Sequence, residues 1–120
     1  MKLIGLKKCS SCKAIEQLLN ELGLPYTYRE INLDNPTASE LASWLEQSGE
    51  ADLKKFVNTS GLKYRELDLK NQWERLSQSA RLDLLASDGM LVKRPILLTP
   101  EGQVYVGPAV RRYLTDLMSE

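Results

Sequence analysis

The first part of the chain changes from a strand pattern to a helix pattern and back. Residues 2–6 form a short apolar run, which predicts a strand. From about residue 11 to residue 22, apolar side chains recur at helical spacing, and Gly23 and Pro25 end the predicted helix. Residues 26–32 then alternate, with β-branched and aromatic side chains, as is typical of a second strand. Two strands joined by one helix predict a right-handed parallel βαβ unit.

The middle of the chain shows helical patterns only. Asn35–Pro36 marks a turn, and Thr37 with Glu40 three residues later has the form of a capping box. A break at residues 58–61 divides the helical material. Both tryptophans are expected to pack in the core rather than to stack on a ligand. The inward apolar positions of three predicted helices are Leu41, Trp44 and Leu45, then Leu53 and Phe56, then Leu84 and Leu85.

Strand patterns return after this block. Residues 96–99 form an apolar run, residues 100–102 have the composition of a turn, and residues 103–106 complete a predicted hairpin. Gly107–Pro108 then opens a final helix. Its apolar positions are Val110, Tyr113, Leu114, Leu117 and Met118.

The order of elements is therefore βαβ, a helical insertion over about residues 37–90, and ββα. This order is typical of an α/β protein with a thioredoxin-like fold. At 120 residues the chain is long enough for one core, so we expect residues 1–120 to form a single domain.

Composition limits the partners of this domain. Lysine plus arginine and aspartate plus glutamate are equal at 16 each, so no surplus positive charge favours nucleic acid or a membrane surface. The apolar run at residues 2–6 is too short for a signal peptide, and no segment reaches the length of a membrane span. We expect a cytoplasmic protein with no direct nucleic-acid partner and no membrane partner.

Cys9 and Cys12 are the only cysteines, and they lie where the first strand meets the first helix. A bridge over four residues closes too small a loop to stabilise a fold much, and a reducing cytoplasm makes structural disulfides rare. Histidine is absent, and two thiolates supply half of a tetrahedral zinc shell, so we expect neither a metal nor another cofactor. Two buried, inert thiols remain an alternative. The setting favours a redox couple.

The two sulfurs are expected to have different roles. Cys9 precedes the helix, where unpaired backbone N–H groups and the helix dipole favour a thiolate. Lys8 and Lys13 can add to this effect if their ammonium groups approach. Cys12 lies one turn later and is better placed to resolve a mixed disulfide that Cys9 has formed.

Arg94–Pro95 is the second candidate group. A proline that enters the third strand of a thioredoxin-like sheet is commonly cis and faces the active cysteine, whereas a trans edge proline is the ordinary alternative. Arg94 would then reach the same pocket and bind an anion or a thiolate, unless it is a solvated surface arginine. We expect the substrate pocket to include Lys8, Ser10, Ser11, Lys13 and Pro95. Lys93, Arg111 and Arg112 can enlarge the positively charged patch around it.

Several strings in order along the chain resemble the arsenate reductase (ArsC) family, which also includes the Spx-type redox regulators. The strings are residues 8–14, 35–36, 56–61, 64–67, 88–96 and 106–107. The resemblance covers nearly the whole chain and implies a thioredoxin-like fold with an inserted helical subdomain. The chain resembles uncharacterised ArsC-like proteins, which share the Asn-Thr-Ser-Gly and Tyr-Arg-Glu-Leu strings, more closely than it resembles the Spx-type regulators.

The resemblance implies two functions. In arsenate reductases that use glutaredoxin, one cysteine attacks arsenate with the help of three arginines, and Cys9 and Arg94 match two of these four positions. The other arginine positions fall at residues 56–58 and 106–108, which contain none. We therefore expect a thiol–disulfide oxidoreductase with arsenate as an unproven substrate, and with glutaredoxin and glutathione or thioredoxin as electron donor. The alternative is an Spx-like redox sensor that binds the C-terminal domain of the RNA polymerase α subunit.

Overall fold

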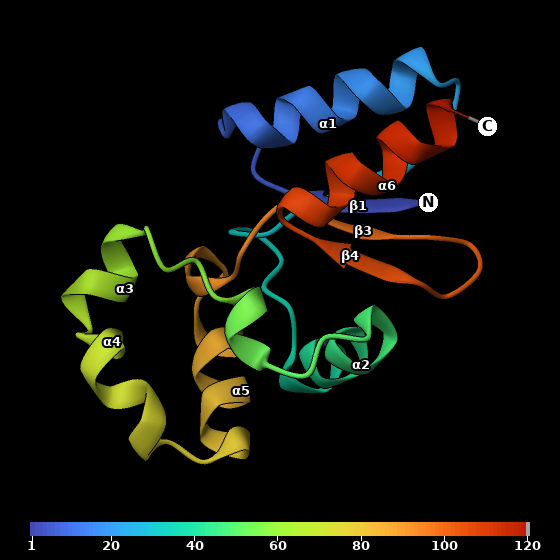
Figure 1. The fold of residues 1–120 in the computed structure, drawn as a ribbon. Helices are drawn as coiled ribbons and strands as arrows, with labels where there is room; N and C mark the ends of the chain where they lie inside the picture. The colour runs from blue at the N-terminus through green and yellow to red at the C-terminus, as the bar shows by residue number, and fades with distance from the viewer. Residues whose placement is uncertain (120) are drawn as a thin grey trace.

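A four-stranded mixed sheet forms the centre of the computed structural model, which describes residues 1–119 (Figure 1). The strands are β1 (Lys2–Gly5), β2 (Thr27–Glu30), β3 (Ile96–Leu98) and β4 (Val104–Val106), and their order is β2-β1-β3-β4. β1 and β2 are parallel, whereas β3 runs antiparallel to both β1 and β4. The sheet has the strand order and directions of the predicted βαβ and ββα units, and the fold is thioredoxin-like.

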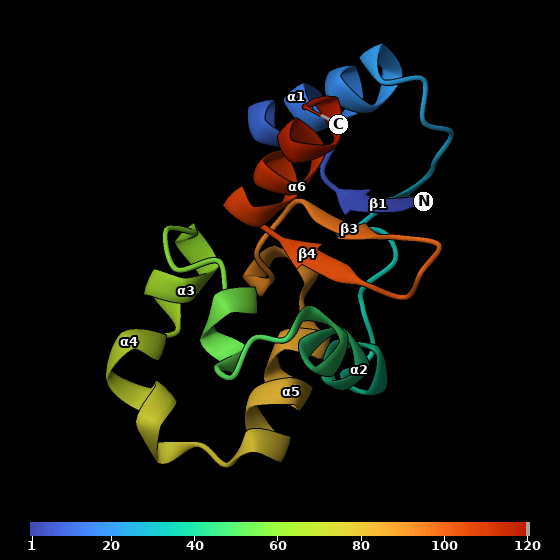
Figure 2. The ribbon, with the colours of Figure 1, turned by 45° about the vertical axis from the view of Figure 1, so that its right-hand side comes forward.

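Two helices cover one face of this sheet. α1 (Ser10–Glu21) and α6 (Pro108–Met118) lie side by side above the strands in both ribbon views (Figures 1 and 2). Leu3 of β1 and Leu97 of β3 are fully buried against them, together with Leu19 and Leu114 from the two helices. α6 begins at Pro108 and is capped by Gly107, as the Gly-Pro pair predicts.

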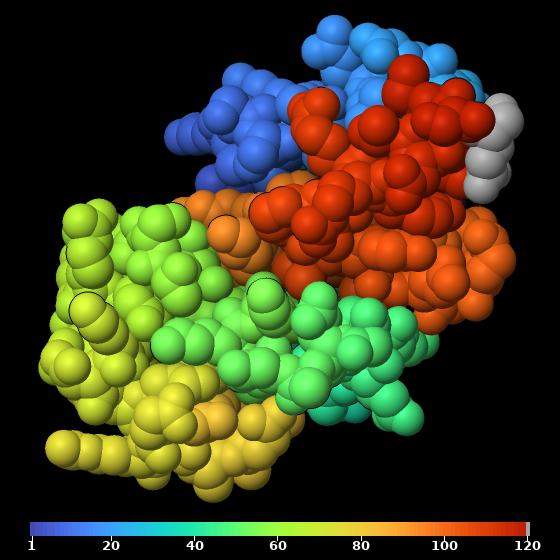
Figure 3. Space-filling model, viewed as in Figure 1, coloured from blue at the N-terminus to red at the C-terminus, as the bar shows by residue number. Residues whose placement is uncertain are grey.

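The segment between β2 and β3 covers the other face (Figure 1), and the space-filling view shows how far it extends from the rest of the chain (Figure 3). Alternate strand residues such as Ile4 and Ile96 point into its core, where both tryptophans are buried as predicted. No helix among residues 1–119 is long and apolar enough to cross a bilayer. The elements of the insertion are α2 (Ala38–Ser48), the 3₁₀ helix η1 (Leu53–Phe56), α3 (Leu62–Glu66), α4 (Leu69–Gln72), η2 (Trp73–Arg75), α5 (Gln78–Ser87) and η3 (Gly89–Leu91).

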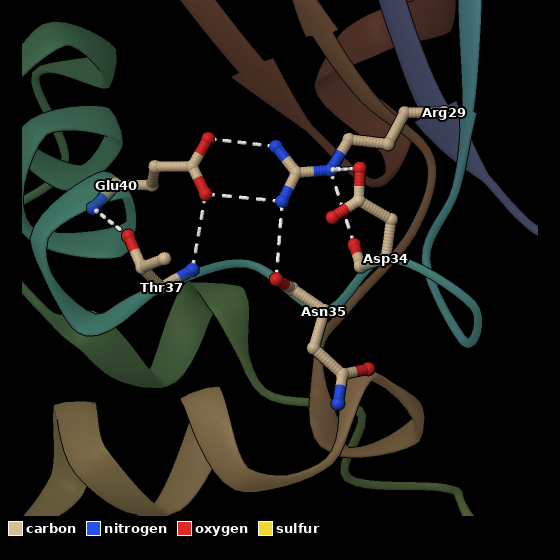
Figure 4. A network of polar contacts seen from close by, with 5 residues as sticks. All are labelled: Arg29, Asp34, Asn35, Thr37 and Glu40. Carbon is tan, nitrogen blue, oxygen red and sulfur yellow. Dashed lines mark hydrogen bonds and ion pairs between the residues drawn. The ribbon is translucent and has the colours of Figure 1, made fainter.

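Arg29 joins the sheet to this insertion through a network of polar contacts (Figure 4). Its Nη1 and Nη2 atoms donate to the two carboxylate oxygens of Glu40 at 2.7 and 3.0 Å, and Nη2 also donates to the Asn35 carbonyl oxygen at 3.1 Å. The same Glu40 carboxylate accepts from the Thr37 backbone N–H, while the Thr37 hydroxyl accepts from the Glu40 N–H. The predicted capping box is therefore present, and it is tied to β2 by an arginine.

The Asn35 side chain forms a second link, to the far end of the insertion. Its Oδ1 accepts a hydrogen bond from the Gly89 N–H at 2.9 Å. A Cβ atom at position 89 would collide with the Ile31 carbonyl oxygen, so this close approach requires glycine. The Asn-Pro and Asp-Gly strings of the sequence therefore have a structural reason that is separate from the chemistry of the cysteines.

Candidate active site

Cys9 occupies the cap position of α1, in the turn that follows β1. Its backbone is extended, at φ −81° and ψ 124°, and its carbonyl oxygen accepts from the Lys13 N–H at 3.0 Å. The Cys9 Sγ atom lies 3.0 Å from the Ser11 hydroxyl oxygen. The side chain is partly exposed, so this sulfur is accessible at the start of the helix, where the sequence places it.

The surroundings of Cys9 lower its pKa to about 7 from an ordinary value of 9.0. Partial burial acts in the opposite direction, but hydrogen bonds from the Ser11 hydroxyl, from the Cys12 thiol and from the backbone of Ser11 and Cys12 outweigh it. These contributions are the main ones, rather than the expected ones from Lys8 and Lys13, whose side chains are exposed. The thiolate is therefore stabilised by the first turn of the helix.

Cys12 has the opposite environment. Its side chain is fully buried, and burial is the main reason why its pKa rises to about 11. The neighbouring Cys9 raises it further, whereas the backbone at Leu6 and the charge of Arg94 act to lower it. At neutral pH the structure therefore holds one sulfur that ionises readily and one that keeps its proton, and the two are close enough to interact.

The last residue of β1 leaves the space into which Cys12 packs. A Cβ atom on Gly5 would lie 2.8 Å from the Cys12 Sγ and 2.9 Å from the Tyr28 hydroxyl oxygen. Both distances are too short for a real side chain, so the two polar groups occupy the volume that any other residue would need. Gly5 thus brings β1, α1 and β2 together at the site.

Tyr28 is the site residue that the sequence did not indicate. Its hydroxyl oxygen is buried and has no hydrogen-bond partner among residues 1–119. Its ring lies under the Lys7 ammonium group, 3.8 Å from Nζ to the ring centroid. Burial, and next the nearby Cys12, raise its pKa well above the usual range of tyrosine. The signal in the sequence was limited to the alternation of the second strand, which does not reveal what the side chain meets.

Arg94 lies in the loop before β3, and its peptide bond to Pro95 is cis, the isomer that the fold favours. The Nη1 atom donates to the Val92 carbonyl oxygen at 3.3 Å, while Nε is buried and has no acceptor within residues 1–119. Arg94 is therefore only partly hydrogen-bonded, and its charge acts on Cys12 as described above.

The Asn-Thr-Ser-Gly string supports this loop from the insertion. The hydrogen bonds of Asn58 go to the segment before Arg94 and not to the sulfurs. Its backbone N–H donates to the Leu91 carbonyl oxygen at 2.8 Å, and its side chain donates to the Met90 carbonyl oxygen at 3.3 Å. A Cβ atom on Gly61 would lie 2.6 Å from the Asn58 side-chain nitrogen. The string thus forms a tight turn that holds the segment leading to Arg94.

A groove of about 470 Å³ lies between α1, the Arg94–Pro95 loop and the start of α6, and neither cysteine is among its lining residues. It begins at Ser11, one hydrogen bond from Cys9, and it is lined by four cations and no acidic residue. None of these cations forms an ion pair with the part of the chain that the structure describes. The cations are Lys93, Arg94, Arg111 and Arg112, and the apolar lining includes Ile15, Pro95 and Pro108.

Only some of the residues predicted for the substrate pocket line this groove. Ser11, Arg94 and Pro95 line the groove, whereas Lys8, Ser10 and Lys13 do not, and Lys13 instead borders a shallow surface beside Glu16. A second cavity of about 490 Å³ lies at the opposite end of the strands, around Lys2 and Thr99. Among residues 1–119 no three acidic, histidine or cysteine side chains gather as a metal site would require.

Comparison with known proteins places the chain in a family. Residues 4–114 match the profile of the ArsC family. An uncharacterised protein of Bacillus subtilis (strain 168), YusI, is 47% identical over 96 residues, which cover 80% of this chain and 79% of that protein.

Two solved structures are similar over most of their length. One, described as a possible arsenate reductase from Streptococcus mutans, has a TM-score of 0.80 at 42% identity and covers 89% of both chains. An ArsC family related protein from Bacteroides fragilis has a TM-score of 0.85 at 38% identity, over 94% of this chain and 95% of that one. By sequence and by structure, this chain belongs to the ArsC family.

Proposed function

We propose that the chain is a thiol–disulfide oxidoreductase in which Cys9 is the nucleophile and Cys12 the resolving thiol. The difference between two neighbouring sulfurs carries the proposal. Cys9 is partly exposed at a helix start with a pKa of about 7, whereas Cys12 is buried with a pKa of about 11. At neutral pH the first is substantially a thiolate and the second a thiol, which is the division that a two-step exchange needs.

The steps follow from this division. The Cys9 thiolate attacks a disulfide R–S–S–R′, forms a Cys9–S–R mixed disulfide and releases R′–S⁻. Cys12 then loses its proton and its sulfur attacks the Cys9 sulfur, which forms the Cys9–Cys12 disulfide and releases R–S⁻. The two leaving thiolates take up protons, and the protein has been oxidised by two electrons. Thioredoxin, or glutathione with glutaredoxin, is the class of donor that returns the dithiol.

Charge in the groove bears on the substrate. Arg94 is present, but the two other arginines of arsenate reductases have no counterpart at residues 56–58 and 106–108, and Lys54 and Lys55 do not line the groove. Each charge-assisted contact to an oxyanion contributes about 1.5–3 kcal/mol. Because two are missing, we place an organic disulfide with negative charge ahead of arsenate, which remains the oxyanion to test.

The presence of Cys12 also favours a second candidate. A single cysteine suffices to attack arsenate, whereas a couple that closes reversibly suits a sensor. In this reading the dithiol and disulfide forms differ in their binding to the C-terminal domain of the RNA polymerase α subunit, as in Spx-type regulators.

One set of assays separates these functions. The purified protein is given either a small disulfide or arsenate, with thioredoxin or with glutathione and glutaredoxin as reductant. We expect turnover with the disulfide, loss of turnover in Cys9→Ser, and arrest at a mixed disulfide, seen by mass spectrometry, in Cys12→Ser. Ser10→Ala is the matched control, because this exposed neighbour does not line the groove, and the hydroxyl at the Cys9 sulfur is that of Ser11.

Two results decide against the enzyme. Full turnover in Cys9→Ser is one, and an alkylation midpoint for Cys9 near pH 9 instead of near pH 7 is the other. Redox-dependent capture of the α-subunit domain without turnover supports the sensor. Turnover with arsenate that needs Cys9 moves the oxyanion ahead of the organic disulfide.

A further inference from the structure

A buried hydrogen-bond donor without a partner lies beside Cys12. The Tyr28 hydroxyl is closed off from solvent and forms no hydrogen bond with the described part of the chain, although buried polar groups in proteins nearly always are hydrogen-bonded. We propose that Tyr28 donates a hydrogen bond to the Cys12 thiolate as that sulfur attacks Cys9. This inference rests on the proposed function, because it concerns the second of its two steps.

The register of the sheet explains how Tyr28 reaches this place. Tyr28 is paired with Leu3 in the parallel β1–β2 ladder; Leu3 belongs to the core between the sheet and α1, and the partly buried Tyr28 side chain packs against that core. The hydroxyl and the Cys12 Sγ both lie within 3 Å of the position that a Gly5 Cβ would fill. The two groups are therefore at most about 6 Å apart, with no side chain of Gly5 between them.

In the resting dithiol form, the Tyr28 hydroxyl has no strong acceptor near it among the described residues. Cys12 is then a neutral thiol, which is a weak acceptor, and the tyrosine keeps its proton because burial and Cys12 both raise its pKa. When Cys12 ionises, a full negative charge appears in a space that water does not reach. A charge-assisted O–H···S⁻ bond then forms where none existed before, so it stabilises the resolving step and not the resting protein.

Other charges around the pair act differently. The Lys7 ammonium lies over the Tyr28 ring and is itself paired with Glu16 at 3.0 Å, and Glu30 is among the acidic groups that disfavour ionisation of Tyr28. On the other side, Arg94 favours a charged Cys12. Once Cys9 is in a mixed disulfide its own negative charge is gone, and burial is then the main opposition to a Cys12 thiolate. Tyr28 is the uncharged donor placed to offset that burial.

The test follows the two steps separately. The reduced protein is mixed in a stopped-flow instrument with dithiobis-nitrobenzoate, a chromogenic aromatic disulfide. Attack by Cys9 releases the first equivalent of coloured thiolate, and attack by Cys12 on the mixed disulfide releases the second. Tyr28→Phe keeps the ring beneath Lys7 and removes only the hydroxyl. The matched control is Tyr26→Phe. The Tyr26 hydroxyl lies on the same side of the sheet but donates to the Glu16 carboxylate, at 2.9 Å.

We expect Tyr28→Phe to leave the first phase unchanged and to slow the second phase roughly ten- to a hundredfold, the range of a hydrogen bond to a charged group. The second-phase rate should rise about tenfold per pH unit in both proteins, with the variant displaced to lower rates throughout. A merely structural effect would also slow the first phase or lower the melting temperature of the variant, whereas loss of the hydrogen bond alone should do neither, because an unsatisfied buried donor has been removed.

Each outcome decides one question. A wild-type protein with two phases and a Tyr28→Phe variant with an unchanged second phase overturn the inference alone. Equal slowing of both phases, or the same slowing in Tyr26→Phe, overturns it as well. A wild-type protein that releases a single equivalent overturns both this inference and the proposed role of Cys12.

Discussion

Arg29 and Arg94 show how differently the two ends of the molecule treat the same side chain. Arg29 connects the sheet to the insertion, and each of its three nitrogens donates to an acceptor, in the Glu40 carboxylate, Asp34 or the Asn35 carbonyl (Figure 4). Arg94 lies beside the cysteines and donates to one carbonyl oxygen at 3.3 Å, and its buried Nε has no partner in the part of the chain that the structure describes.

The difference extends to the groups around each arginine. The insertion joins the sheet through a closed set of partners in which the capping box, Asn35 and Gly89 use one another's donors and acceptors. The site near Cys9 keeps open donors, namely the Tyr28 hydroxyl and Arg94, together with a groove whose lining residues include four cations and no carboxylate. Buried polar groups without partners reduce stability, so their concentration at one end indicates where the protein binds or transforms something.

Gly89→Ala tests the closed end most severely. The new Cβ would meet the Ile31 carbonyl oxygen, a backbone atom that cannot turn away, as well as the Asn35 side chain. We expect a loss of about 3 kcal/mol or more in the free energy of unfolding, measured by urea titration. The rate of Cys9 alkylation in the protein that remains folded should be unchanged.

Gly49→Ala in the same insertion is the control. This glycine has φ +75° but nothing within 4 Å of its Cβ position, so the backbone strain alone should cost about 1 kcal/mol. If the two variants are equally stable, the close packing of Gly89 on Ile31 is not what joins the insertion to the sheet.

The arginines themselves provide a matched pair of smaller effects. Arg29→Met leaves Glu40 without its cation, and we expect a loss of about 1–2 kcal/mol, reduced because Glu40 is more than a third exposed. Arg94→Met should change stability by less than about 0.5 kcal/mol. It should instead slow the reaction of Cys9 with an anionic disulfide roughly tenfold, with little effect on a neutral disulfide.

Urea titration and stopped-flow rates measure the two halves of this comparison. Added salt should narrow the difference between wild type and Arg94→Met toward the anionic disulfide, because screening weakens the attraction. A large loss of stability in Arg94→Met, or a loss of reactivity in Arg29→Met, would show that the two ends are not separated in function as their contacts indicate.

Local patterns in the sequence carried most of the fold. The capping box at Thr37, the hairpin around residue 100 and the Gly-Pro start of α6 depend on neighbours in sequence, so the chain alone predicted them. The position of Cys9 at a helix start followed in the same way, from a strand pattern, a turn and a helix pattern.

What the sequence did not predict depends on contacts between distant segments. The meeting of Gly5, Cys12 and Tyr28 needs the β1–β2 register and the packing of α1 on the sheet, and nothing local to any one of the three specifies it. Lys8 and Lys13 were expected to act on Cys9 because they are its neighbours in sequence. In the structure they are exposed, and the Ser11 hydroxyl and Cys12 are the nearer donors.

The smallest effect concerns the reactive end, where ionisation of Cys9 should make stability depend on pH. The folded protein releases the Cys9 proton near pH 7, whereas the unfolded chain keeps it up to about 9.0, so between these values the unfolded state binds more protons. The free energy of unfolding should therefore rise with pH across this window, and this contribution should be lost as the pH falls through 7. Cys12 acts in the opposite direction, but only above pH 9, because its pKa in the folded protein is raised to about 11.

Urea midpoints measured for the wild type and for Cys9→Ser isolate the contribution of Cys9 to the free energy of unfolding, since every other group is shared. We expect the wild type to gain less than about 1 kcal/mol relative to the variant between pH 7 and pH 9, because solvent weakens the effect at a partly exposed sulfur. Parallel curves for the two proteins would mean that the helix start does not hold a thiolate, and the contrast between an open reactive end and a closed structural one would then rest on Arg94 and Tyr28 alone.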